Sequence, residues 1–125
     1  MSLHIVGHDG SERGDDAVAL ATRLATIYDA KLLPVHVIAM PPVRDRFTGP
    51  VVERLEDQAG DVLARAVERI GQERAAPPRA VFASSPAAGL QEACAAEGAG
   101  LVTVGSSHRG PIGRVLAGTT AERPG

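Results

Sequence analysis

The sequence predicts an α/β fold, an open parallel sheet with helices on both faces. Short β-branched apolar runs alternate with longer segments of helical periodicity, beginning and ending with a strand. The apolar residues are mainly alanine, valine and leucine, and aromatic residues make up only 2% of the chain, which is typical of an aliphatic α/β core. The apolar run Leu101 to Val104 ends abruptly in small, polar and basic residues, as a buried strand does where it opens into a ligand loop.

The amino-terminal part predicts a strand, a polar turn and a helix. Leu3 to Val6 is the strand, and it ends at the run Gly7 to Ser11. A helix follows from roughly Asp15 to Tyr28, with aspartates in its first turn, where the helix dipole favours carboxylates. Its predicted apolar face consists of Val18, Leu20, Ala21, Leu24, Ala25 and Ile27.

A second strand and a loop come next. Lys31 to Met40 has the β propensity of a strand. Pro34 suits a bulge or a start position there, because proline donates no hydrogen bond to a ladder. Val43 to Pro50 shows no periodicity, so we expect a surface loop.

The second helix has the clearest pattern in the chain. Its apolar residues recur at three- and four-residue steps with charges between them: Leu55, Ala59, Val62, Leu63, Ala66, Val67 and Ile70. Pro77-Pro78 ends the pattern, and Arg79 to Ala83 is a short strand. Ser85-Pro86 is typical of a helix start, with serine as the cap. That third helix should bury Cys94 and end near the glycines Gly98 and Gly100.

Length, charge and cysteine content narrow the class of protein. A chain of 125 residues is one domain, and a net charge of −2 argues against nucleic acid as the main partner. A single cysteine allows no internal disulfide and suits a reducing compartment. No apolar run is long enough to span a membrane. We therefore expect a soluble cytoplasmic protein with neither a nucleic-acid nor a membrane partner.

The loop after the fourth strand has the composition of an anion site. Gly105 and Gly110 permit positive φ and close backbone approach, which leaves amide hydrogens free to point at an anion. Thr119 and Glu122 have capping-box spacing, so a helix should begin there with its positive end towards the loop. In an open parallel sheet, ligands bind beyond the carboxyl ends of the strands, where the winding direction reverses. If the first and fourth strands are neighbours, Asp9 faces this loop across a nucleotide-shaped crevice.

On these residues the chain resembles the universal stress proteins over nearly all its length. Val6-Gly7-His8-Asp9-Gly10-Ser11-Glu12 is similar to that family's first-strand motif, and Val35-His36-Val37-Ile38 is similar to its second. The most specific match is Gly105-x2-His108-x9-Gly118-Thr119, which resembles the family's nucleotide motif Gly-x2-Gly-x9-Gly-[Ser/Thr].

The resemblance implies a single domain over residues 1–125, an adenine-nucleotide alpha-hydrolase-like fold and the strand order 3-2-1-4. It places an adenine-contacting carboxylate on Asp9 and an adenine-facing backbone position on Val37. The implied ligand is ATP or another adenine nucleotide, with magnesium held through the phosphates. With no strong catalytic base in view, ATP hydrolysis would be slow at most. The implied binding residues are Gly7, His8, Asp9, Val37, Val104, Gly105, Ser106, Ser107, His108, Arg109, Gly118, Thr119 and Thr120.

His108 departs from the family motif, because it stands where the family has its middle glycine. Its side chain either blocks the approach of phosphate or joins Arg109 in contributing positive charge to it. His108→Gly should tighten ATP binding in the first case and weaken it in the second. The first case leaves an alternative function, an interaction or scaffold module of the same family that binds no nucleotide.

The carboxyl-terminal end is the second departure. Family domains continue through a full helix and a fifth strand, whereas this sequence stops at Pro124-Gly125, and Pro124 would break the helix that Thr119 begins. We therefore expect the fifth strand to be missing or incomplete, which would leave Leu101 to Val104 as an exposed apolar edge. Such an edge predicts a homodimer through an unusual surface, or a protein prone to association.

Other interpretations of the same residues are weaker. Gly105 to Gly110 has the spacing of a P-loop, but Pro111-Ile112 replaces its Lys-[Ser/Thr] pair. Ser107 resembles the serine of a nucleophile elbow, which would make a small esterase with Asp9, but Arg109 stands where that motif needs glycine. A Rossmann GxGxxG motif is absent, and the histidines lack the spacing of metal-ligand pairs.

Overall fold

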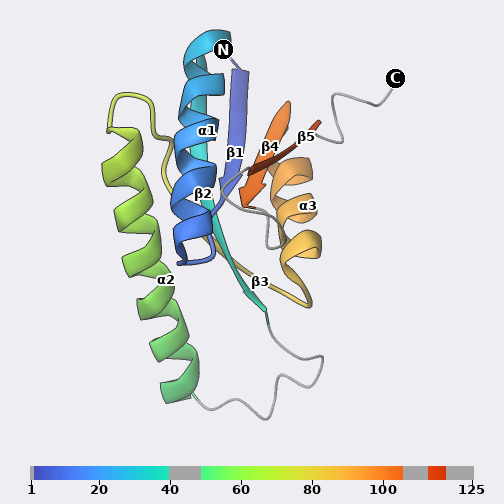
Figure 1. The fold of residues 1–125 in the computed structure, drawn as a ribbon. Coiled ribbons are helices and arrows are strands. Elements are labelled where there is room, and N and C mark those ends of the chain that lie inside the picture. The colour runs from blue at the N-terminus through green and yellow to red at the C-terminus, as the bar shows by residue number, and fades with distance from the viewer. Residues whose placement is uncertain (1, 40–48, 106–112, 118–125) are drawn as a thin grey trace.

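The computed structural model describes residues 2–39, 49–105 and 113–117, and a five-stranded sheet forms its centre (Figure 1). The strands lie in the order β3-β2-β1-β4-β5. The first four in sequence pair in parallel, and β5 is antiparallel to β4. The predicted order 3-2-1-4 is confirmed. The strands are β1 (Ser2–Gly7), β2 (Ala30–Ala39), β3 (Arg79–Ala83), β4 (Leu101–Gly105) and β5 (Gly113–Ala117).

Helices cover both faces of the sheet, as predicted. Figure 1 shows α1 (Glu12–Tyr28) and α2 (Gly49–Ile70) on one side and α3 (Pro86–Glu97) on the other. Each face has its own aliphatic core. On the α1 and α2 side the fully buried residues include Val6, Ala17, Val18, Ala21, Ala25, Leu32 and Ala66. On the α3 side they include Ile5, Leu33, Val35, Ala93, Cys94 and Ala99.

Helix α1 begins at Glu12 because Ser11 caps it, accepting a hydrogen bond from the Gly14 amide. The helix therefore starts three residues earlier than predicted. Its buried stripe follows three- and four-residue steps through Val18, Ala21 and Ala25, as expected. The inclusion of Ile27 in that stripe is wrong: it lies off the stripe on the last turn, and 73% of it is exposed.

Helix α2 also begins earlier than the periodicity indicates, at Gly49. Gly49 and Pro50, predicted to end a surface loop, belong to the first turn of the helix. Proline is tolerated there because the first-turn N–H groups have no partner within the helix. The rest of that predicted loop lies outside the described residues.

Pro34 lies inside β2 and not at a start or bulge, since β1 and β2 pair without interruption through Val6 and Pro34. Leu32 bonds to the segment before β3, donating to the Arg74 carbonyl and accepting from the Ala76 amide. Pro34, two residues on, has its nitrogen on this same side. The β2–β3 ladder begins only at Val35 and Arg79, so the missing donor falls where no ladder bond is made.

The predicted caps of α3 are confirmed. The Ser85 side chain accepts from the Ala88 amide, Pro86 is the first helical residue, and Gly98 ends the helix in the left-handed conformation. Cys94 is buried as expected, and its Sγ lies 3.4 Å from the Ala99 carbonyl oxygen.

The prediction that β4 is an exposed edge is wrong, because β5 pairs with its whole length, from Leu101 opposite Ala117 to Gly105 opposite Gly113. The strand that covers β4 is formed by residues before Thr119, and not by the residues after it. β4 and β5 therefore form an antiparallel hairpin. The helix predicted to begin at Thr119 lies outside the described residues.

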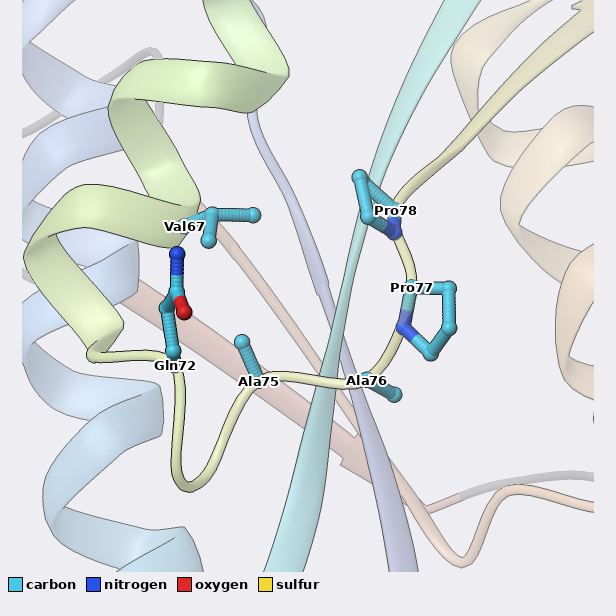
Figure 2. A pocket seen from close by; sticks show the side chains of 6 residues that line it. All are labelled: Val67, Gln72, Ala75, Ala76, Pro77 and Pro78. Carbon is cyan, nitrogen blue, oxygen red and sulfur yellow. The ribbon is translucent and has the colours of Figure 1, made fainter.

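A hollow of about 250 Å³ lies where α2 leads into β3 (Figure 2). Figure 2 shows Val67 and Gln72 on one side and the extended run Ala75 to Pro78 on the other. Ala75 forms an isolated bridge with Leu32, near the amino end of β2. The hollow therefore lies at the opposite edge of the sheet from the predicted crevice.

Acid should destabilise the protein in part through His4, a buried residue of β1 whose Nδ1 has no hydrogen-bond partner within the described chain. Burial lowers the pKa of His4 from its ordinary 6.5. The folded state therefore binds fewer protons than the unfolded state as pH falls below that value, and stability drops. His4→Leu should raise the free energy of unfolding by about 1 kcal/mol at about pH 5 and flatten its pH dependence. Urea unfolding of both proteins measures this; identical acid slopes would contradict it.

Candidate functional site

The site expected from the sequence is at the carboxyl edge of the sheet, where β1 ends. β1 lies between β2 and β4, and its last residue, Gly7, is paired with Val35 on one side and with Val104 on the other. The chain enters β2 and β4 from opposite faces of the sheet, so β1 and β4 flank the point where the winding reverses. The turn after β1 thus lies beside the end of β4, as predicted.

Asp9 lies in a tight turn between β1 and α1. Its Oδ1 accepts hydrogen bonds from both the Ser11 amide, at 2.9 Å, and the Ser11 hydroxyl. Desolvation raises the pKa of Asp9, but the two Ser11 bonds, with smaller contributions from His8 and the Asp9 backbone, outweigh it, so the net pKa is lowered. The Asp9 side chain therefore stabilises the turn, and its exposed carboxylate is ionised at neutral pH.

Val37 lies on the β2 side of this edge, beyond the last residue of β2 that pairs with β1. The Val35 carbonyl accepts a hydrogen bond from the His8 amide, so the backbone N–H and C=O groups of Val35 face β1. The same groups of Val37, two residues further along, face the same way. β1 has ended by this point, so they face the turn that holds Asp9. This agrees with a backbone role for Val37, whose side chain packs on the other face against α3, beside Gly89.

Gly105 lies against the first turn of α1. A Cβ atom added there would be 2.6 Å from the Arg13 carbonyl oxygen, closer than real Cβ contacts occur. The close approach seen at Gly105 is therefore to the backbone of α1, and the expected approach to an anion stays a prediction. The expected positive φ is not seen: among the described glycines it occurs at Gly10, Gly71 and Gly98. The other predicted residues of this loop lie outside the described residues: Ser106, Ser107, His108, Arg109, Gly118, Thr119 and Thr120.

His8 has its side chain fully buried, which the sequence did not indicate. Its Nε2 lies 2.9 Å from Asp15 Oδ1, and its Nδ1 accepts the Gly10 amide at 2.9 Å. The ring packs on Gly14, where an added Cβ would lie within 3 Å of three ring atoms. The imidazole therefore packs on α1 and stabilises the turn through its hydrogen bond to the Gly10 amide.

Asp15 joins this arrangement to α2. Arg65 Nε and Arg69 Nε lie 3.6 and 3.3 Å from its Oδ1. The hydrogen bond from His8 lowers the pKa of Asp15 most, burial raises it, and the two arginines lower it further. In the sequence, this charged cluster is indicated only by the spacing of Arg65 and Arg69, which places both on one face of α2.

The described residues hold no metal centre: in ranges 2–39, 49–105 and 113–117, no three His, Cys, Asp or Glu side chains gather to bind an ion. None of the helices within those ranges is long and apolar enough to cross a membrane.

The fold defines a mostly parallel α/β protein whose candidate site lies at a strand switch point. The sequence profile of the universal stress protein family matches residues 4–123, so the chain belongs to that family. A Thermus aquaticus relative, "Universal stress protein in QAH/OAS sulfhydrylase 3'region", is 28% identical over an alignment of 123 residues that covers 95% of this chain and 87% of the relative.

Solved structures agree with this assignment. A universal stress family protein from Burkholderia pseudomallei superposes with a TM-score of 0.71 at 30% identity, covering 84% of this chain and 81% of that one. The universal stress protein from Archaeoglobus fulgidus gives 0.65 at 19% identity, with coverages of 97% and 87%, and supports the fold. A universal stress protein in complex with cAMP gives 0.52 at 23% identity, with coverages of 81% and 69%.

Proposed function

We propose that this chain binds an adenine nucleotide, ATP in the first instance, in the crevice between the turn after β1 and the end of β4. The observation that carries the proposal is the ionised Asp9 carboxylate beside the carboxyl ends of β1 and β4. Asp9 Oδ1 is occupied by Ser11, and an ionised carboxylate has acceptor sites beyond those two bonds. These can accept hydrogen bonds from the exocyclic amine of adenine.

The same edge of the sheet offers groups that would bind the remaining parts of the nucleotide. Val37 offers backbone groups on the β2 side, and the loop that leaves Gly105 would take the phosphates, with magnesium bound through them. The solved relative with cAMP lends support, since an adenine nucleotide binds a protein with this fold. We expect hydrolysis of ATP to be slow at most. A cytoplasmic location and a homodimer stay predictions, and the exposed-edge argument for the dimer no longer applies.

Asp9→Ala tests the proposal by calorimetric titration with ATP. The native chain should bind ATP saturably, and Asp9→Ala should weaken it by about 10- to 100-fold, because a hydrogen bond to a charged group is lost. Asp9→Asn keeps an acceptor for Ser11 and so serves as the control for the turn itself. Its affinity for ATP should lie between those of the native chain and Asp9→Ala. Inosine triphosphate, which lacks the exocyclic amine, should bind the native chain more weakly than ATP does.

No saturable heat with ATP, AMP or cyclic AMP would contradict the proposal. That result would favour the alternative, an interaction module of this family that binds no nucleotide.

A further inference from the structure

His8 connects the turn after β1 to both β2 and α1, beside the candidate site. Its amide donates to the Val35 carbonyl at 2.9 Å, and its carbonyl accepts the ring N–H of His36 at 2.7 Å, which ties it to β2. Its side chain bonds to Asp15 on α1 and to the Gly10 amide in the turn. The ring is 0% exposed and cannot touch a ligand in the crevice. Its influence on a ligand must therefore pass through the turn.

These bonds specify the protonation state of the ring. The Gly10 amide can only donate, so His8 Nδ1 must carry a lone pair. The ring hydrogen is then on Nε2, where it donates to the Asp15 carboxylate. The arrangement is thus that of a neutral imidazole with both nitrogens in use.

Protonation would break one of the two bonds. A hydrogen on Nδ1 would face the Gly10 N–H, donor against donor, while the bond to Asp15 would survive. Gly10 has a φ of 93°, its amide is fixed by the bond to Nδ1, and it lies between Asp9 and Ser11. Loss of its acceptor therefore acts on the residue that we propose contacts adenine.

The charged groups around the ring oppose one another. Asp15 on α1 and Asp9 in the turn favour a protonated ring, whereas Arg65 and Arg69 on α2 offset Asp15. His36 on β2 donates to the His8 carbonyl in either of its own charge states. Among the described residues no cation bonds the ring, so the effect of acid on the turn depends on the hydrogen bond at Nδ1.

We infer that His8 is a positioning residue: its neutral ring holds the Asp9–Ser11 turn in the nucleotide-binding conformation, and protonation of the ring releases the turn and weakens binding. The inference rests on the proposed adenine-nucleotide function. It makes affinity for the nucleotide dependent on pH through a group that never touches the ligand.

Two uncharged replacements separate the two ring bonds. His8→Asn places an amide oxygen near the position of Nδ1 and keeps an acceptor for Gly10, whereas His8→Gln places its amide near Nε2 and keeps only the contact with Asp15. At about pH 7.5, His8→Asn should bind ATP within about threefold of the native chain, and His8→Gln about tenfold more weakly. Circular dichroism establishes that each variant is folded.

The pH dependence gives a readout that a merely structural role would not move. Between about pH 7.5 and 5.5, the native chain should lose about fivefold in ATP affinity relative to His8→Asn. The ratio of the two affinities cancels titration of the ATP phosphates and of His108, which both proteins share. Asp15→Asn keeps an acceptor for Nε2 but removes the negative charge, so it should move the acid loss to lower pH.

The ligand-free protein supplies an independent measurement, because the Gly10 amide resonance should shift together with titration of the His8 ring. Native binding that is matched by His8→Gln, or a pH-independent ratio to His8→Asn, would overturn the inference alone. No binding of ATP by the native chain at either pH would overturn the proposed function and this inference with it.

Discussion

Replacing Gly14 by alanine should lower the free energy of unfolding by about 2 kcal/mol. The added Cβ would lie 2.6 Å from His8 Cε1 and closer still to Nδ1. The ring cannot move aside freely, because it is fully buried and hydrogen-bonded at both nitrogens. Alanine gains at most about 1 kcal/mol of helix propensity over glycine, which is less than the cost of overpacking plus a strained hydrogen bond.

Gly60→Ala is the matched control within a helix, since an added Cβ at Gly60 meets nothing within 4 Å. It should raise stability by about 0.5–1 kcal/mol. His8→Ala is itself destabilising, but in that background Gly14→Ala should cost less, because the ring that the new methyl meets is gone. Urea unfolding of the native chain, the three single variants and the double variant measures this. A stabilised Gly14→Ala would show that the His8 ring does not pack on α1 as described.

Gly105→Ala should cost about 3 kcal/mol and also weaken ATP binding, because it separates the two sides of the crevice. Its Cβ would meet the Arg13 carbonyl oxygen at 2.6 Å and the carbonyl carbon at 2.9 Å. These are backbone atoms, so relief requires the end of β4 to move away from α1. That movement would displace the start of the phosphate loop relative to Asp9.

Gly100→Ala, just before the other end of β4, controls for the loss of a glycine. No atom lies within 4 Å of an added Cβ there. The hydrogen bond from the Gly100 amide to the Leu3 carbonyl does not need a glycine. Its stability should stay within about 0.5 kcal/mol of the native value. Equal effects of Gly105→Ala and Gly100→Ala in thermal unfolding would contradict the close contact between β4 and α1.

The parts of the fold that the sequence predicts are those with local signals. Helix α2 repeats its apolar residues at helical spacing, and Ser85-Pro86 caps α3, so both were recognisable without the structure. The strand order came from resemblance to the family, and the adjacency of β1 and β4 at the crevice followed from it.

The rest depends on contacts between distant residues. Pro34 is harmless within β2 only because its nitrogen faces a gap before β3, which no local rule reveals. Gly113–Ala117 holds only one β-branched residue, Val115, so its local sequence does not identify it as a strand until β4 is there to pair with it. The partnership of His8 with Asp15 depends on how α1 docks on the sheet, and nothing in the spacing of the two residues indicates it.

The central claim is the position of the nucleotide, and mapping of backbone amide shifts by NMR during titration with ATP tests it most directly. ATP should shift the backbone amide resonances of residues along the carboxyl edge: Asp9, Gly10, Ser11, Val37 and Gly105. Val67, Gln72 and Ala75, which line the hollow at the opposite edge, should stay unchanged. Shifts confined to that hollow, or no saturable shift at the carboxyl edge, would contradict it.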